Sequence, residues 1–268
     1  FKRGLHTDAH FGPYGNRRGY FMSEQIEGRN AVLEAFRSGK CVDKLFILDG
    51  CQDGPVRTIA REARKTDTII NYVSKERLDQ LSETRAHQGV IAQVAAYEYS
   101  TVEEILARAE EKGEPPFLIL LDNVEDPHNL GAIIRTANLA GAHGVIIPKR
   151  RAVGLTSTVA KTSAGAINYT PVAKVTNIVR TIEELKEKGI WFVCADMGGE
   201  TMYDLDLTGP MGLVIGNEGE GVSRLVREAC DFTASIPMKG DIDSLNASVA
   251  AGVLAYEIVR QRLVKSSK

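Results

Sequence analysis

Three short segments of the chain place amides, carboxylates and a guanidinium beside turns and apolar runs. They are "DNVEDPHNLGAIIRTAN" at 122–138, "LVIGNEGEGVSRL" at 213–225 and "SIPMKGDIDSLNASVAAGVLAYE" at 235–257. Such groups can orient a ligand by hydrogen bonds and can stabilise charge that develops during a reaction. Each segment is therefore a candidate part of a catalytic or binding site.

The first segment predicts a helix with one apolar face. Its apolar residues recur at the spacing i, i+3, i+4 and i+7, and they are Leu130, Ile133, Ile134 and Ala137. Because these residues face the core, Arg135 points away from them and is free to meet a ligand. Near the start of the helix, Asp126 or Asn129 is expected to cap it. Capping does not exclude a second role for Asn129.

The second segment is a glycine-rich loop between a buried strand and a helix. Gly216, Gly219 and Gly221 allow tight turns and a close approach of the backbone to a ligand. The order G-N-E-G-E-G is not the dinucleotide fingerprint, and no Lys-Ser or Lys-Thr follows as in a phosphate loop. Since Glu218 and Glu220 would repel a pyrophosphate, the loop better suits a cationic ligand or the hydroxyls of an adenosine.

The third segment predicts a long helix with Asn246 in its first turn, where the side chain bonds the helix terminus or serves a site. One apolar stripe is expected to face the domain's own sheet: Leu245, Val249, Gly252, Val253 and Tyr256. Further apolar residues lie beyond that stripe: Leu254, Ala255, Ile258 and Val259. One helix with two apolar faces needs two partners, which predicts a homodimer joined through this domain.

These segments lie in a domain where strands and helices alternate. Strands are expected at 117–122, 144–148, 171–174, 190–195, 211–215 and 232–236. Helices are expected at 129–141, 155–165, 177–188, 221–229 and 244–263. The alternation predicts an α/β fold with a mostly parallel sheet covered on both faces. Ligands of such sheets bind beyond the carboxyl ends of the strands, where the segments begin.

A smaller α/β domain is expected at residues 22–99. Its helices are predicted at 28–38, 55–65 and 75–81, and its strands at 44–49, 69–74 and 89–97. A linker helix at 100–116 then leads to the second domain at 117–268. Residues 1–21 lack periodicity and are expected to be a flexible tail or an addition ahead of a natural start at Met22.

Composition limits the function classes. The 33 basic and 35 acidic residues give a net charge of -2, so any polyanion must be met by a local patch. No apolar run approaches the roughly 18 residues of a membrane helix, and no signal peptide is evident, which favours the cytoplasm. The four cysteines form no C-x-x-C pair, and His128 and His143 lack a ligand pattern, so no metal is expected.

In this order and spacing, the three segments closely resemble the motifs of the SpoU or TrmH-type (SPOUT superfamily) RNA ribose 2′-O-methyltransferases. The small domain, with "EGRNAVLEA" and "HQGVIAQV", resembles the L30-like RNA-binding domain of the 23S rRNA guanosine 2′-O-methyltransferases of this family. The resemblance covers nearly all of the chain after Met22.

The resemblance implies an S-adenosyl-L-methionine-dependent enzyme with a C-terminal trefoil knot that works as a homodimer. The family's catalytic set maps onto Asn129, Arg135, Glu218 and Asn246. Its cofactor-binding positions map onto Gly216, Ile236 and Leu245. A guanidinium stays protonated, so Arg135 is expected to clamp a phosphate and stabilise the developing alkoxide. The proton would pass to phosphate or solvent.

Basic residues on the expected binding edge are candidates for contacts with RNA phosphates. They are Lys149, Arg150 and Arg151, directly after a strand, and Lys161 on the next helix. The small domain adds Arg29, Arg61, Arg64, Lys65 and His87. The alternative for each of these residues is an ordinary exposed charge that contacts no RNA phosphate. The alternatives are a tRNA ribose methyltransferase, a non-catalytic RNA-binding protein and a nucleotide-dependent dehydrogenase. The absence of the dinucleotide fingerprint argues against the dehydrogenase.

Overall fold

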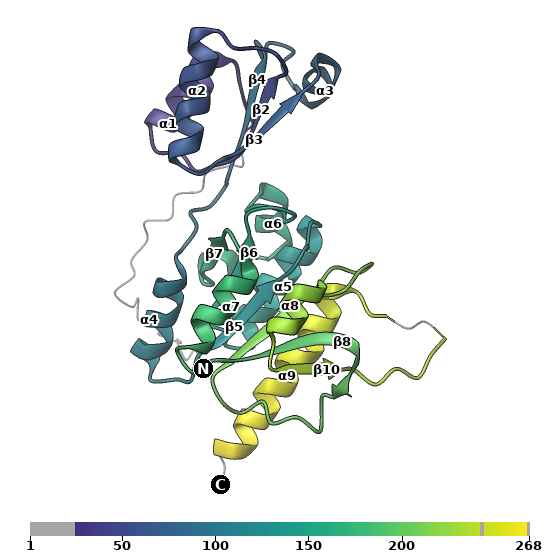
Figure 1. The fold of residues 1–268 in the computed structure, drawn as a ribbon. Helices are drawn as coiled ribbons and strands as arrows, with labels where there is room; N and C mark the ends of the chain where they lie inside the picture. The colour runs from purple at the N-terminus through teal and green to yellow at the C-terminus, as the bar shows by residue number, and fades with distance from the viewer. Residues whose placement is uncertain (1–24, 242–243, 267–268) are drawn as a thin grey trace, which may run out of the picture.

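Two separate β-sheets organise the chain, one in each of two α/β domains (Figure 1). The computed structural model describes residues 25–241 and 244–266. The tail expected at 1–21 lies outside the described residues. Within the described ranges, no helix has the length and apolarity needed to cross a membrane.

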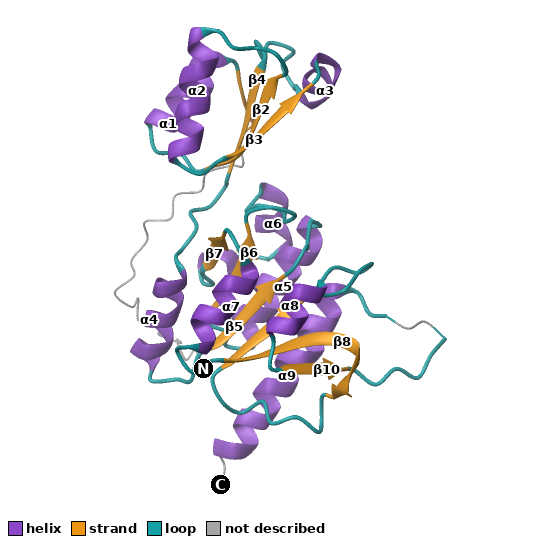
Figure 2. Ribbon diagram, in the orientation of Figure 1, coloured by secondary structure: helices purple, strands orange, loops and turns teal. Residues whose placement is uncertain are grey.

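The first sheet has the strand order β1-β4-β2-β3. Its strands are β1 Gln25–Glu27, β2 Val42–Leu48, β3 Ile69–Val73 and β4 Val90–Val94, and its helices are α1 Arg29–Arg37, α2 Gly54–Lys65 and α3 Lys75–Leu81. Helices α1 and α2 lie on one side of this sheet and α3 on the other (Figure 2). Strand β1 was not predicted, because three residues are too few to show an alternating pattern.

The second sheet is entirely parallel, in the order β10-β8-β9-β5-β6-β7, which confirms the expected sheet class. Its strands are β5 Phe117–Leu121, β6 Gly144–Pro148, β7 Val172–Val175, β8 Trp191–Thr201, β9 Met211–Ile215 and β10 Phe232–Ser235. Its helices are α5 Pro127–Leu139, α6 Ser157–Thr162, α7 Ile178–Lys186, α8 Arg224–Ala229 and α9 Ala247–Ser266, with a 3-10 turn at Ala166–Asn168. Helix α4 (Val102–Lys112) precedes β5.

Alternate residues of β5 enter two different cores. Ile119 and Leu121 pack among residues of α5 and α9, whereas Leu118 and Leu120 pack among residues of α4 and α7. Successive side chains of a strand point to opposite faces, so a strand covered on both sides is apolar throughout. This is why "FLILL" contains no polar residue.

Strand β8 extends to Thr201, six residues beyond the predicted end. It pairs with β10 up to Cys194 and again from Glu200, after a shift in register. None of the intervening residues, 195–199, is buried, and they carry no apolar pattern, so the sequence did not indicate that the strand continues.

The two faces of α9 are the reverse of the prediction. The residues buried against the domain include Ala247, Ala251, Leu254, Ala255 and Ile258. Two members of the stripe expected to face the sheet, Val249 and Tyr256, are 49% and 50% exposed. The prediction was wrong because both faces are apolar, and periodicity alone does not tell which face meets the sheet. The alanines of the buried face allow α9 to pack closely on α5 and β9.

A polar cluster joins the two domains. Asp43 on β2 pairs with Lys174 on β7, with 2.5 Å between Oδ1 and Nζ. The hydroxyl of Tyr99 donates to Asp43 Oδ2 over 3.1 Å and accepts from the Leu155 amide over 3.0 Å. A second ion pair, Lys149 with Asp67, also crosses between the domains.

Candidate active site

Three of the four predicted catalytic side chains form a hydrogen-bonded cluster at the carboxyl edge of the second sheet. Asn129 Nδ2 donates to Glu218 Oε1 over 3.0 Å, and Asn246 Nδ2 donates to Asn129 Oδ1 over 3.0 Å. Asn246 Nδ2 also donates to Glu218 Oε1. Glu218 and Asn246 lie 89 and 117 residues after Asn129 in the chain. The fold therefore brings together residues that are remote in sequence.

Asn129 owes its position to the first turn of α5. Asp126 Oδ1 accepts from the His128 amide over 2.9 Å, and Pro127 begins the helix. Asp126 is thus the cap, and the Asn129 side chain is released to bond Glu218. Asn129 is only 6% exposed, so its amide is held against the protein.

Asn246 both caps α9 and joins the cluster. Its Oδ1 accepts from the Ser248 amide over 2.9 Å and from the Val249 amide over 3.3 Å. These bonds satisfy backbone donors that a helix start leaves free. Because the oxygen faces the helix, the Nδ2 group must face Asn129 and Glu218. Asn246 therefore bonds the helix terminus, which was one of its two expected roles, and its amide is also joined to Asn129 and Glu218.

Asn217 shapes the loop that carries Glu218. Its Oδ1 accepts from the Gly219 amide over 2.9 Å and from the Glu220 amide over 2.6 Å. Gly221 closes the turn with a left-handed φ of +68° and donates to the Asn217 carbonyl over 3.1 Å. Asn217 was not among the predicted site residues, although an asparagine within glycines is a known turn signal.

Gly216 is required by the packing of this loop on itself. A Cβ atom at Gly216 would lie 2.0 Å from the carbonyl carbon of Gly221 and 2.3 Å from the amide nitrogen of Val222. The close approach that the sequence suggested is therefore between two parts of the loop. Gly216 is buried, while the other predicted cofactor positions, Ile236 and Leu245, are half-buried after β10 and before α9.

Asp122 connects the first two segments. This buried carboxylate, at the end of β5, accepts from the Ser223 amide through Oδ2 over 2.8 Å. The bond fixes the start of α8, and with it the end of the glycine loop, against β5. Asp122 lies in the first segment but was not among the predicted site residues.

A cavity of about 630 Å³ opens beside the cluster. Residues 123–126 and Asn129 line one side, residues 217–220 line another, and Arg151 and Ala247 complete the lining. The charged residues of the lining are Glu125, Asp126, Glu218, Glu220 and Arg151. Among the residues that the structure describes, one cation thus faces four carboxylates.

Arg135 lies apart from the other three predicted catalytic residues. It follows Asn129 by six residues on α5, which places it about 9 Å further along the helix axis. Its side chain is exposed, as its place on the helix predicted. Within the described part of the chain it makes no hydrogen bond or ion pair.

The basic residues after β6 have different surroundings. Lys149 pairs with Asp67 of the small domain, Arg150 is exposed, and Arg151 lines the cavity. Lys161 is exposed in the last turn of α6. The run that the sequence presents as one patch is therefore divided among a domain contact, the solvent and the site.

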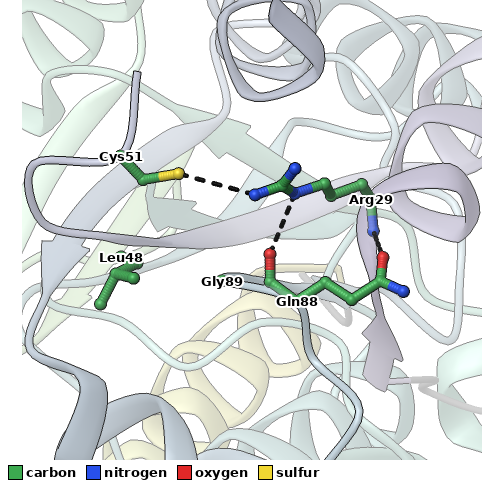
Figure 3. Close-up of a pocket in the computed structure, with 5 residues that line it drawn as sticks. All are labelled: Arg29, Leu48, Cys51, Gln88 and Gly89. Carbon is green, nitrogen blue, oxygen red and sulfur yellow. Dashed lines mark hydrogen bonds between the residues drawn. The ribbon is translucent and has the colours of Figure 1, made fainter. Parts of the chain in front are cut away.

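Arg29 lines a second cavity, of about 500 Å³, in the small domain (Figure 3). Its Nε donates to the Gln88 carbonyl over 3.1 Å, and its Nη2 lies 3.8 Å from Cys51 Sγ. An ion pair with Asp53, at 2.6 Å, also holds the guanidinium. Arg29 therefore has structural partners as well as a place at the cavity.

Other basic residues of the small domain differ in accessibility. Arg61 and Lys65 pair with Glu62, and Arg64 is exposed. His87 is only 8% exposed; one ring nitrogen lies 3.0 Å from Asp79 Oδ1, and the other accepts from the Gly89 amide over 3.0 Å. The prediction of a phosphate contact by His87 was wrong, because both nitrogens are occupied.

His143 has a structural place. Its Nδ1 accepts from the Phe117 amide over 3.0 Å and its Nε2 lies 3.1 Å from Glu114, while burial lowers the pKa of the ring. In the described ranges, no group of three or more histidines, cysteines or acids is placed to hold a metal ion.

Comparisons with known proteins identify the family of both domains. A sequence model of the SpoU rRNA methylase family matches residues 116–256, and a model described as RNA 2′-O ribose methyltransferase substrate binding matches residues 25–100. YacO of Bacillus subtilis, named as a TrmH family tRNA/rRNA methyltransferase, is 51% identical over 245 residues, which are 90% of this chain and 98% of YacO.

Solved structures show the same two-domain fold. The SpoU methyltransferase AviRb from Streptomyces viridochromogenes, crystallised with AdoMet, is 28% identical with a TM-score of 0.57, over 90% of each chain. An AdoMet-bound rRNA methyltransferase from Sinorhizobium meliloti is 25% identical with a TM-score of 0.55, over 89% of this chain and 87% of that one. The chain therefore belongs to the SpoU rRNA methylase family, as an RNA 2′-O-ribose methyltransferase with an N-terminal substrate-binding domain.

Proposed function

We propose that this protein uses S-adenosyl-L-methionine to methylate a ribose 2′-hydroxyl in cytoplasmic RNA, with a guanosine of 23S rRNA as substrate. The observation that carries the proposal is the cluster of Asn129, Glu218 and Asn246 beside a cavity. The family supports the cofactor, because AviRb and the Sinorhizobium enzyme were both crystallised with AdoMet.

The residues around the cluster fit this methyl donor. S-Adenosylmethionine, when bound, supplies a methyl group on a positively charged sulfur. The carboxylates of Glu218 and Glu220 complement a cation, in agreement with the charge argument made from the sequence. Gly216, Ile236 and Leu245 are the proposed cofactor-binding positions, within the C-terminal knot that the family resemblance implies.

The cluster would orient the ribose for attack by its 2′-oxygen. Glu218 Oε1 is occupied by the two asparagines, whereas Oε2 accepts no hydrogen bond from the described residues. That free oxygen can accept from a ribose hydroxyl, and the asparagines hold the carboxylate in place. Arg135 would stabilise the developing alkoxide and clamp a phosphate, while phosphate or solvent takes the proton.

A homodimer would bring Arg135 to the cluster of the second chain. Two observations support this arrangement: Arg135 is exposed and unbonded among the described residues, and α9, which packs on α5, has an exposed apolar face that includes Val249 and Tyr256. In a two-fold dimer each site would then contain the cluster of one chain and Arg135 of the other.

Mixing two inactive variants tests this arrangement. Arg135→Ala and Asn246→Ala are each expected to keep about 1% of wild-type activity or less when alone. If Arg135 acts across the dimer, re-associating equal amounts leaves one intact site in each mixed dimer and restores about a quarter of wild-type activity. If Arg135 acts within its own chain, no site is intact and the mixture stays inactive.

RNA would be held by both domains. Lys149, Arg150, Arg151 and Lys161 in the catalytic domain, and Arg29 in the small domain, are the proposed phosphate contacts. The match of residues 25–100 to the substrate-binding model supports a role for the small domain. A tRNA substrate is the alternative, since the name of YacO covers both tRNA and rRNA.

The proposal is tested with labelled S-adenosylmethionine and with 23S rRNA and tRNA purified from cells that lack the protein. Label is expected on a ribose 2′-oxygen of a 23S rRNA guanosine. Label on a base would refute the chemistry, and label on tRNA alone would refute the substrate. Calorimetry with S-adenosylhomocysteine separates an enzyme from an RNA-binding protein that binds no methyl donor.

A further inference from the structure

Arg151 has an unusual backbone conformation for its residue type. Its φ is +54°, in the left-handed region that disfavours residues with a Cβ atom. The neighbouring Ala152 is buried, and the Val153 amide donates to the Val124 carbonyl over 3.3 Å. These contacts tie the loop after β6 to the loop after β5. The surrounding structure thus holds Arg151 in a strained conformation at the cavity.

Arg151 differs in its surroundings from the basic residues beside it. Lys149 is committed to Asp67, and Arg150 does not line the cavity. Of the cavity-lining residues in the described ranges, Arg151 is the one that carries a positive charge. The strained conformation therefore accompanies the basic residue that the fold places at the site.

Apart from Arg151, the charged residues of the cavity lining repel RNA phosphates. Glu125, Asp126, Glu218 and Glu220 contribute four carboxylates, and each nucleotide brings a phosphate of the same sign. A cation in the lining offsets this repulsion for the phosphates of a nucleotide whose ribose enters the cavity. A guanidinium is suited to the task, because it stays charged and binds two phosphate oxygens through parallel hydrogen bonds.

We propose that Arg151 is the positioning residue that holds the 3′-phosphate of the target nucleotide, an inference that rests on the proposed ribose methylation. The 3′-phosphate is attached to the carbon next to the one that carries the 2′-hydroxyl. Holding that phosphate therefore limits where the 2′-oxygen can lie relative to Glu218 and Asn129. Arg151 acts through the phosphate and does not touch the reacting atoms.

Substitution by glycine separates this role from a role in folding. Arg151→Gly removes the side chain and also suits the left-handed backbone, so its melting temperature should equal or exceed that of the wild type. Its kcat/KM for RNA should nevertheless fall about 100-fold, because a charged positioning contact is lost. A variant that keeps full activity would overturn the proposal.

Two further variants test the charge and its geometry. Arg151→Gln should lower the slope of log Kd for RNA against log salt by about one, as expected for one lost phosphate contact. Arg151→Lys should restore the slope but only part of kcat/KM, because an ammonium lacks the planar fork. Arg180→Gln is the matched control: Arg180 is an exposed residue of α7 that pairs with Glu184, and its loss should leave both values unchanged.

The ligand of Arg151 is identified by comparing two affinities. In Arg151→Gln the affinity for 23S rRNA should fall, because the variant loses its contact with an RNA phosphate. The affinity for S-adenosylhomocysteine should stay within about two-fold of the wild-type value, because that ligand does not use this contact. The reverse pattern would show that the guanidinium binds the carboxylate of the methyl donor, and would overturn the proposal. If the wild type methylates no RNA, the proposed function fails, but the salt slopes of RNA binding still decide whether Arg151 contacts a phosphate.

Discussion

Gly216→Ala is expected to damage both the fold and the site, because the new methyl group meets backbone atoms. Its Cβ would lie 2.0 Å from the carbonyl carbon of Gly221. Carbon atoms in contact lie about 3.5–4.0 Å apart, so the loop must move by roughly 1.5 Å. Backbone cannot rotate away as a flexible side chain can.

This displacement is large enough to separate Glu218 from the asparagines. The Asn129–Glu218 bond is 3.0 Å long, and a contact lengthened past about 3.5 Å is no longer a hydrogen bond. Overpacking costs about 1–3 kcal/mol, and a lost hydrogen bond to a charged group costs about 1.5–3 kcal/mol. We therefore expect the free energy of unfolding to fall by about 3–5 kcal/mol and turnover to fall about 10²-fold.

Urea denaturation followed by the fluorescence of Trp191, the single tryptophan, measures the change in stability. Gly219→Ala is the control in the same loop. Its Cβ would have Asn217 Oδ1 as nearest neighbour at 3.8 Å, so stability should change by no more than about 0.5 kcal/mol. Equal stabilities of the two variants, with wild-type turnover in Gly216→Ala, would refute the argument from loop packing.

Three further predictions concern catalysis, assembly and pH. Arg135→Ala should keep the fold and the affinity for S-adenosylhomocysteine but lower turnover at saturating RNA by about 10² or more, as when an oxyanion-stabilising donor is lost; unchanged turnover would remove Arg135 from the mechanism. Tyr256→Glu puts a charge on the exposed face of α9, so sedimentation equilibrium at micromolar protein should shift from a dimer to the 29.2 kDa chain mass. A wild type that already sediments at that mass would contradict the homodimer. Burial lowers the pKa of His143 in the folded chain below its ordinary value of about 6.5. As the pH falls below about 6.5, the unfolded chain therefore binds a proton more readily than the folded chain does. The stability that His143 contributes above that pH is lost on acidification. Urea titrations at pH 7 and pH 5 should show a smaller loss in His143→Gln, and an equal loss would exclude His143 as the cause.

Apart from β1 and the 3-10 turn, the sequence by itself determined the order of the elements, and it determined the class of the second sheet. The prediction of a strand at 211–215 matches β9, and the one at 144–148 matches β6. A strand buried on both faces is apolar at every position and ends where turn residues begin, so its signal is local. The three motif segments are local as well, which is why their chemistry and the family resemblance were visible before the fold.

Only the tertiary structure decided how these segments meet. Asp126, and not Asn129, accepts the His128 amide, and this contact shows which of the two caps α5. The contact between Asn129 and Asn246 joins residues that are 117 positions apart in the chain. The face of α9 that is buried depended on the surfaces of α5 and β9, because both faces are apolar. Charged side chains such as Lys149 and Arg151 take partners from other segments. Contacts of this kind depend on the relative position of distant elements, and no periodicity within a single element encodes them.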